Sequence, residues 1–368
     1  MSSKWWAVLA ASGVLAVGVA ACGDDSSDDS STGSSGGASV SGELAGAGAS
    51  SQEAAQEAWI AGFQDANPDA TISYDPVGSG GGREQFIAGG VAYAGSDSPF
   101  SDDEGELTKA TDRCKPGDLV QIPAYVSPIA VVYNLSGVDT LNLSPETIAG
   151  IFTQEITKWN DPAIAKDNPD VELPDTDITP VNRSDESGTT ANFTDYLSAT
   201  APDVWTYEPD GVWPVKGGEA ANGTSGVIEA VTAGDGAIGY ADESQAGDLG
   251  IANVKVGNEF VAPSAEGAAA LLEASPEDKE AESGPYVFAF SLDRTTTDPS
   301  QYPVTLVSYE IGCTQYDDAA QAALVKGYFD YVISADGQTA AADNAGSAPI
   351  TDQLRKEIQP AVDAIQAG

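Results

Sequence analysis

Short apolar runs of strand-like length alternate with helical patterns along most of this chain, and this alternation constrains its fold more than any other feature. The strand-like runs are 71–74, 125–133, 178–181, 237–240 and 304–311. The helical patterns between them are 52–64, 84–88, 145–151, 191–197, 226–233 and 319–333. Such alternation favours an α/β architecture in which helices cover the sheets. Pro123 and Pro303 each precede a long apolar run, and there we expect the chain to pass between two lobes.

The composition fits a folded chain and excludes several functions. The 368 residues are 41% hydrophobic, which is enough for two ordinary domains with real cores. The absence of histidine excludes histidine general bases, catalytic triads and most zinc sites. A formal net charge of -42 argues against nucleic acid and against polybasic attachment to anionic lipid. The acidic balance favours a soluble exterior in an extracellular or envelope setting.

The N-terminal segment is typical of export. Lys4 precedes the apolar run 7–21, which ends in Val-Ala-Ala before Cys22 and is too short for a good membrane span. This pattern resembles the lipobox of bacterial lipoproteins, which implies a signal peptide over 1–21 and a palmitate-type lipid on Cys22. An ordinary signal peptide with an incidental cysteine is the alternative. Residues 22–43 are mostly Gly, Ser and Asp, which predicts a flexible tether.

Two further cysteines, Cys114 and Cys313, lie far apart in the sequence. In an exported chain two remaining cysteines suggest one disulfide, provided that the two positions are neighbours in space. Two free thiols are the alternative.

The stretch 183–190 predicts a helix start suited to an anion. Its Ser187, Gly188 and Thr189 lie directly before an aromatic and aliphatic helical pattern at 191–197. The first backbone N–H groups of a helix lack intrahelical partners and carry the positive end of the dipole. Arg183 is close enough to add a planar, bidentate donor.

Two more helix starts have the same chemistry. Ser50 and Ser51 precede the helical pattern 52–64, so one of them is expected to be its N-cap. Ser79 lies in the Gly-rich stretch 78–82, where glycine permits positive φ and close approach of a ligand. A single such serine is usually only a cap, but three helix starts with an arginine beside one of them indicate a shared anion site.

Asp97 follows the apolar run 90–94 and is the fourth element of this hypothetical site. By itself it is expected to be a turn or cap residue. In an anion site, however, its carboxylate would accept the proton that phosphate retains at neutral pH. Sulfate has no such proton and would be repelled, which gives specificity through a repulsive element.

These motifs together resemble the PstS family, the phosphate-binding lipoproteins of bacterial phosphate ABC transporters. The matching segments are Gly-Ala-Gly-Ala-Ser at 46–50, Gly-Ser-Gly-Gly-Gly at 78–82, Gly-Ser-Asp at 95–97, Arg-Ser-Asp-Glu-Ser-Gly-Thr at 183–189 and Gly-Ala-Ile-Gly-Tyr at 236–240. The resemblance implies a two-lobed, type II periplasmic-binding-protein fold with two hinge crossings and the ligand between the lobes. It implies one lobe over 44–123 plus 303–368 and the other over 124–302.

The resemblance also implies roles for individual residues. The expected phosphate-binding residues are Ser50, Ser51, Ser79, Asp97, Arg183, Ser187, Gly188 and Thr189. Asp185 is expected to pair with Arg183 and orient it. Ser50-Ser51 replaces a commoner Thr-aromatic pair, and Glu186 stands where glycine is common. We expect the side chain of Glu186 to point to solvent.

The function implied is binding of inorganic phosphate outside the cytoplasm and its delivery to the permease subunits of an ABC transporter. A monomer anchored by lipid to the outer face of the cytoplasmic membrane is expected, without catalysis, cofactor, metal or nucleic acid. Arsenate is expected to bind as well, because it shares the shape and the proton of phosphate. The alternatives are a binding protein for another oxyanion, a phosphatase-like surface enzyme and a surface adhesin.

Overall fold

The computed structural model describes residues 40–102, 105–279, 281 and 284–368. The signal peptide predicted over 1–21, Cys22 and almost all of the predicted tether lie outside these residues. None of the helices in the described part of the chain is long and apolar enough to cross a membrane.

A nine-stranded mixed sheet forms the centre of the fold, with the order β2-β1-β3-β12-β4-β8-β6-β7 and with β9 paired to β4. In that order its strands are β2 (Ala70–Asp75), β1 (Gly42–Gly48), β3 (Tyr93–Ser96), β12 (Thr305–Cys313), β4 (Leu119–Asn134), β8 (Ala237–Asp242), β6 (Thr179–Arg183), β7 (Glu219–Ala221) and β9 (Gly250–Ile251). Two small sheets add β11 (Glu259–Val261), β10 (Asn253–Val256) and β5 (Asn142–Leu143), and β13 (Gln315–Tyr316) with β14 (Gln366–Ala367).

Strand β4 joins the two parts of this sheet. Its first half pairs antiparallel with β12, from Leu119 opposite Cys313 to Pro128 opposite Thr305, and its last residues pair antiparallel with β8. Pro123 lies inside this strand, although the sequence suggested that the strand would begin after it. The register with β12 shifts between Ser308 and Tyr309, so the ladder is irregular next to the proline. Such irregularities are the places where a sheet accepts a residue without an N–H donor.

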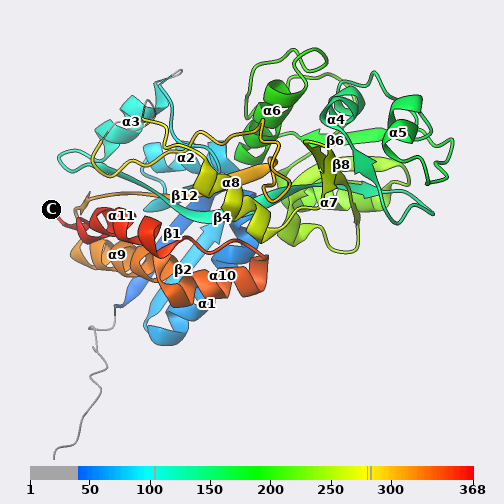
Figure 1. Ribbon diagram of the computed structural model, residues 1–368. Coiled ribbons are helices and arrows are strands. Elements are labelled where there is room, and N and C mark those ends of the chain that lie inside the picture. Colours follow the sequence, from blue (N-terminus) through cyan, green and yellow to red (C-terminus); the bar gives the residue numbers. More distant parts are fainter. Residues whose placement is uncertain (1–39, 103–104, 280, 282–283) are drawn as a thin grey trace, which may run out of the picture. The chain divides into compact units, whose positions relative to one another are not determined.

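Helices cover both parts of the sheet. They are α1 (Glu53–Ala66), α2 (Ser79–Ile87), α3 (Glu106–Arg113), α4 (Pro145–Phe152), α5 (Pro162–Asp167), α6 (Gly188–Thr200), α7 (Gly223–Ala233), α8 (Ala265–Ala274), α9 (Ala319–Ile333), α10 (Ala335–Ala345) and α11 (Asp352–Asp363), with the short 3-10 helices η1 (Ser50–Gln52) and η2 (Glu243–Gln245). In Figure 1, α1, α9, α10 and α11 gather around β1 and β2, whereas α4, α5, α6 and α7 gather around β6 and β8. The predicted α/β architecture with two lobes is therefore present.

Aromatic side chains fill the core of each lobe. In the first, Tyr328 of α9 lies 5.4 Å from Tyr93 and 5.5 Å from Phe63, measured between ring centroids. In the second, Phe193 of α6 stacks on Tyr240 of β8 at 4.4 Å. Because α6 and β8 carry these rings, packing in the second core fixes the start of α6 relative to the sheet.

Cys114, at the end of α3, forms a disulfide with Cys313, the last residue of β12. The prediction of this bond is thus confirmed. The two residues are 199 positions apart in the sequence, so the bond closes a very long loop of the unfolded chain.

Replacing both cysteines by serine is expected to lower the free energy of unfolding by about 2–4 kcal/mol, because the unfolded chain regains the entropy of the open loop. Denaturant unfolding of the wild type and of the Cys114→Ser, Cys313→Ser variant measures this difference. Reductant should destabilise only the wild type. Equal midpoints for the two proteins under non-reducing conditions would contradict the prediction.

Candidate functional site

Helix α6 begins where the sequence indicated, directly beyond β6. Ser187 is its N-cap, and the Ser187 hydroxyl accepts a hydrogen bond from the Thr190 amide at 3.2 Å. Gly188 and Thr189 form the first turn, whose backbone N–H groups have no intrahelical acceptor. A Cβ on Gly188 would lie only 2.6 Å from the Ser79 hydroxyl and 2.7 Å from Cβ of Asp97, so only glycine permits this close approach.

Asp97 lies just beyond β3, is 3% exposed, and accepts hydrogen bonds from both parts of the molecule. Its Oδ1 accepts from the hydroxyls of Ser51 and Ser308, each at 2.6 Å, and its Oδ2 accepts from the hydroxyl of Thr189 at 3.0 Å. Its backbone amide donates to the Ser79 hydroxyl at 3.1 Å. The structure therefore brings Asp97 into contact with a residue, Ser308, that lies 211 positions away in the sequence.

Two opposing effects act on the pKa of Asp97. Burial raises this pKa above its ordinary value, because a carboxylate loses its hydration in the interior. The hydrogen bonds from Ser308, Ser51 and Thr189 and the positive charge of Arg183 lower it, in that order of size. The net result is a raised pKa, and the carboxylate depends on its donors to stay ionised.

Arg183, the last residue of β6, is 3% exposed and pairs with Asp185. Its Nε donates to Asp185 Oδ1 at 2.8 Å, and a terminal nitrogen of the guanidinium donates to the other carboxylate oxygen. The Gly223 amide also donates to Asp185 Oδ1, at 3.1 Å. Burial raises the pKa of Asp185, but the hydrogen bonds and charge of Arg183 together with backbone donors, the Gly223 amide among them, outweigh burial, so the net pKa is lowered.

Tyr240, the last residue of the motif at 236–240, contacts the start of α6. Its buried hydroxyl lies 2.7 Å from the Thr190 hydroxyl and accepts from the Arg183 amide at 3.3 Å. One side chain of β8 thereby holds both the end of β6 and the first turn of α6. The sequence marked Tyr240 as part of a motif but gave it no role.

The prediction that Ser50 or Ser51 is a helix N-cap is wrong. Both residues belong to η1, and α1 begins after Gln52 without a side-chain cap. The hydroxyls have tertiary partners instead: that of Ser51 donates to Asp97, and that of Ser50 lies 2.9 Å from the hydroxyl of Thr224 and accepts from the Thr224 amide at 3.0 Å. Ser50 is thus directed to α7 rather than to Asp97.

The expectation that Glu186 points to solvent holds only in part, because this exposed residue also has an ion-pair partner. The Glu186 carboxylate accepts from Arg83 of α2 at 2.6 Å, and its side chain is half-exposed, at 48%. Arg83 also pairs with Glu106 at 2.9 Å, and the Gly80 amide donates to the Glu186 carbonyl at 3.2 Å. Glu186 therefore connects the loop before α6 to α2. The buried arginine attracts it, and the local sequence gave no sign of that partner.

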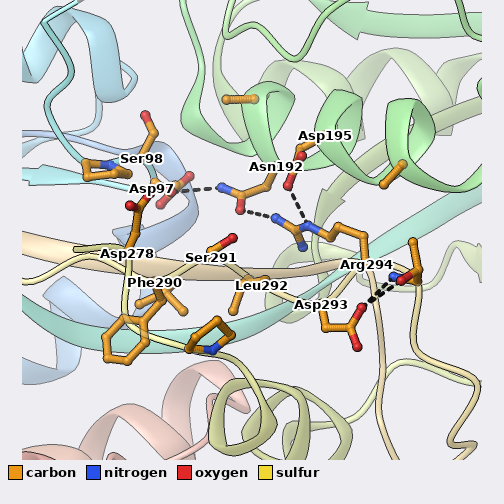
Figure 2. Close-up of a pocket in the computed structure, with 16 residues that line it drawn as sticks. Asp97, Ser98, Asn192, Asp195, Asp278, Phe290, Ser291, Leu292, Asp293 and Arg294 are labelled. Carbon is orange, nitrogen blue, oxygen red and sulfur yellow. Dashed lines mark hydrogen bonds and ion pairs between the residues drawn. The ribbon is translucent and has the colours of Figure 1, made fainter. Parts of the chain in front are cut away.

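A cavity of about 610 Å³ lies beside the group formed by Asp97 and α6. Figure 2 shows Asn192 between Asp97 and Arg294 on the wall of this cavity. The Asn192 amide nitrogen donates to the Asp97 carbonyl at 2.8 Å, and its oxygen accepts from Arg294 at 2.6 Å. Arg294 also donates to Asp195 at 2.8 Å, so these side chains are tied to one another.

Sequence reasoning missed Ser308, Thr224, Asn192 and Arg83. A signal existed for one of them: Ser308 and Glu310 interrupt the apolar run 304–311, and polar residues in a buried strand need partners. The others carry no comparable local signal. Among the described residues, no group of three or more His, Cys, Asp or Glu could hold a metal ion.

Comparison with known proteins gives the family. The family model described as "PBP superfamily domain" matches residues 33–336. Phosphate-binding protein PstS 3 of Mycobacterium tuberculosis is 36% identical over 312 residues, which cover 82% of this chain and 81% of that protein. Phosphate-binding protein PstS of Xylella fastidiosa is 32% identical over 310 residues, which cover 82% of this chain and 79% of that protein. The chain belongs to the PstS family of the PBP superfamily.

Solved structures agree with this PstS-family assignment at the level of the fold. A high affinity periplasmic phosphate-binding protein (PfluDING), bound with phosphate, superposes with a TM-score of 0.70 at 24% identity, covering 87% of this chain and 93% of that one. The phosphate-binding protein from Stenotrophomonas maltophilia gives a TM-score of 0.67 at 23% identity, with the same coverage. The predicted two-lobed periplasmic-binding-protein fold is thereby confirmed.

Because of the Arg183–Asp185 pair, we expect the free energy of unfolding of this PstS-family chain to depend on pH. We expect Asp185→Asn to lower the free energy of unfolding by about 3 kcal/mol at neutral pH, since it leaves a buried guanidinium without its counter-charge. The pKa of Asp185 is lowered in the folded protein, so its contribution is present above the ordinary value of 3.8 and disappears as pH falls through the lowered pKa. Urea unfolding of both proteins at neutral and at acidic pH measures this.

Asp175→Asn is the matched control, because Asp175 pairs with Lys158 while 71% of its side chain is exposed. Its unfolding midpoint should equal that of the wild type at either pH. A difference between wild type and Asp185→Asn that stays constant from neutral to strongly acidic pH would contradict the assignment of the effect to this carboxylate.

Proposed function

We propose that this chain binds inorganic phosphate between its two lobes and delivers it to the permease of an ABC transporter. The observation that carries the proposal is the buried group in which Asp97 meets Ser51, Ser79 and Thr189 at the start of α6. The names of the relatives, phosphate-binding protein PstS in Mycobacterium tuberculosis and Xylella fastidiosa, support the same ligand.

The first turn of α6 and Arg183 supply the positive side of the proposed site. The N–H groups of Gly188 and Thr189 open a helix of 13 residues, whose dipole favours an anion at this end. The guanidinium of Arg183 is buried and is held in one orientation by Asp185. A planar donor held in this way loses little conformational entropy when it binds an oxyanion.

Asp97 supplies the discrimination between oxyanions. At neutral pH phosphate carries a proton that it donates to the carboxylate, whereas sulfate would place two unprotonated oxygens against a buried negative charge. We therefore propose phosphate rather than sulfate as the ligand. Its further partners are the hydroxyls of Ser79 and Ser187 and the backbone N–H groups of Ser51 and Thr189, because the hydroxyls of Ser51 and Thr189 donate to Asp97. Ser50 lies at the edge of the site. No covalent chemistry is proposed.

The sheet supports a division of the chain into two lobes. We propose one lobe over 44–123 plus 303–368 and another over 124–302. They are joined through β4, which pairs with β12 as far as Pro128 and with β8 from Ile129 onward. The hydrogen bonds from Thr189 to Asp97 and between Ser50 and Thr224 then run from one lobe to the other. Such contacts favour the closed arrangement that a permease would recognise.

We further propose that the protein acts outside the cytoplasm as a monomer. For export and anchoring the support is the sequence pattern of 1–43, which predicts a signal peptide, a lipid on Cys22 and a tether. An anchored binding protein remains close to the permease that it serves, which raises its effective concentration there.

Isothermal titration calorimetry tests the proposed ligand. The wild type is expected to bind phosphate with micromolar or tighter affinity and to give no heat with sulfate. Arg183→Met should weaken phosphate binding by about 2–5 kcal/mol, because it removes a buried charged donor. Asp97→Asn should gain affinity for sulfate, since an amide can donate to an unprotonated oxygen.

Arg355→Met is the control, because Arg355 lies on α11 and pairs with Asp352 there. It should bind phosphate as the wild type does. Equal affinity of the wild type for sulfate and phosphate would disprove the discrimination, and the absence of phosphate binding would disprove the proposed function. Metal-dependent release of phosphate from an ester would favour the phosphatase-like alternative.

The Arg83–Glu186 ion pair leads to a kinetic prediction. It joins α2 of one proposed lobe to the loop before α6 of the other, so it should slow the opening that releases phosphate. Since Glu186 is half-exposed, the pair is worth only about 0.2–1 kcal/mol. We expect Glu186→Gln to speed phosphate dissociation about 1.5- to 5-fold, with little change in association.

Stopped-flow displacement of phosphate measures this rate. Glu84→Gln is the matched control, because Glu84 is exposed and lies next to Arg83 on α2. The effect should shrink as ionic strength rises, because salt screens an exposed pair. A Glu186→Gln dissociation rate equal to that of the wild type at low salt would contradict the role of the ion pair.

A further inference from the structure

A line of buried polar side chains leads away from Asp97 into the first lobe. Ser308, on β12, donates to Asp97 Oδ1 at 2.6 Å and itself accepts from the Gln52 amide nitrogen at 2.6 Å. An amide nitrogen only donates, so the Ser308 oxygen is the acceptor in that contact and its single hydrogen is directed to Asp97. The Gln52 nitrogen also lies 3.4 Å from the Tyr309 carbonyl, a second acceptor that fixes the orientation of the amide.

The line continues beyond Gln52 with the same direction of donation. Gln56 donates to the Gln52 side-chain oxygen at 2.8 Å and to Glu310 Oε1 at 2.7 Å. The Gln56 oxygen accepts from the Tyr328 hydroxyl at 2.7 Å. Each amide therefore has an acceptor on its nitrogen side and a donor on its oxygen side, and reversing one would place like groups against each other.

Burial makes this directionality energetically important. Gln52, Ser308 and Glu310 are fully buried, and Gln56 is 1% exposed. In such surroundings a polar group without a partner is costly, so the chain holds one hydrogen-bond pattern rather than several. Burial also raises the pKa of Glu310 well above its ordinary range, while the hydrogen bond from Gln56 lowers it.

The two oxygens of Asp97 are consequently unequal. Among contacts of the described residues, Oδ1 accepts two hydroxyl hydrogens, from Ser51 and Ser308, and Oδ2 accepts one, from Thr189. A carboxylate oxygen has two lone-pair directions, so Oδ1 is saturated and Oδ2 can accept one more hydrogen.

We propose that Ser308, oriented by Gln52 and Gln56, determines the oxyanion specificity of the site by committing its hydroxyl hydrogen to Asp97. This inference rests on the proposed phosphate-binding function. The committed hydrogen stabilises the negative charge of Asp97 and leaves Oδ2 as the acceptor for the proton of phosphate. Ser308 is a positioning residue, because it acts on the ligand through Asp97.

Removing this donor has a predictable effect on protonation. Without the Ser308 hydroxyl the ionised form of Asp97 loses one of its stabilising hydrogen bonds, so its pKa rises further. As pH falls through that pKa the carboxyl gains a proton and becomes a donor. A protonated Asp97 accepts sulfate, and discrimination against sulfate is lost at a higher pH than in the wild type.

Other charged and titratable groups surround Asp97. Arg183 at the end of β6 and Tyr74 on β2 interact with it electrostatically. Glu310 lies two residues beyond Ser308 on β12, and Asp195, Asp278 and Arg294 line the cavity that Asp97 also lines. Substitution of Ser308 leaves all of these in place. A shift in the pH profile of that variant therefore reports on the missing hydroxyl.

Calorimetric titration of phosphate and of sulfate at a series of pH values from about 4.5 to 8 tests the proposal. For Ser308→Ala we expect the pH at which the phosphate-over-sulfate affinity ratio declines to rise by about one unit, a tenfold change in proton affinity. Gln52→Met, which frees the Ser308 hydroxyl to rotate, should shift the profile in the same direction by a smaller amount. Ser308→Thr, which keeps the hydroxyl, should retain the wild-type profile.

Thr305→Val is the matched control. It removes another buried hydroxyl from β12, one that donates to the Tyr302 carbonyl at 2.7 Å, and should leave the profile unchanged. Thermal unfolding identifies a variant that fails to fold. If Ser308→Ala does not fold, the pH profile of Gln52→Met tests the proposal in its place. A folded Ser308→Ala variant with the wild-type ratio at every pH overturns the proposal while phosphate binding stands. A wild type that does not bind phosphate overturns the proposed function itself.

Discussion

One buried carboxylate, that of Asp97, is the constraint on which the rest of the site depends. A negative charge that is 3% exposed stays ionised only if donors surround it, and three hydroxyls do so from η1, β12 and α6. These elements come from different parts of the chain, so satisfying Asp97 requires the fold to bring them together. The disulfide, the shared strand β4 and the aromatic cores all contribute to that arrangement.

The overall charge of the chain does not conflict with an anion site. A formal net charge of -42 acts mainly through exposed groups, and physiological salt screens exposed charges beyond roughly 8 Å. Inside the fold the relevant groups are the buried guanidinium of Arg183, the first N–H groups of α6 and several hydroxyls. Asp185 neutralises Arg183 and fixes its direction, so the proposed site would attract an oxyanion by geometry more than by net charge.

Local patterns in the sequence predicted much of the fold, and they predicted the site in part. The α/β alternation, the helix start at Ser187 and the Cys114–Cys313 bond follow from periodicity, capping chemistry and cysteine number, and all three are present. Ser308 was missed because its partner lies 211 positions away, and no local rule relates a strand serine to such a residue. The partner of Glu186 was missed for the same reason, since Arg83 is 103 positions distant.

A crystal structure of the protein grown with phosphate measures directly where the oxyanion lies relative to Asp97 and α6. We expect a phosphate with one oxygen within about 3 Å of Asp97 Oδ2, another on the guanidinium of Arg183 and a third on the first N–H groups of α6. We also expect Ser308 still to contact Oδ1 in that complex. A phosphate bound in the cavity beside Arg294, without contact to Asp97, would contradict the proposed site.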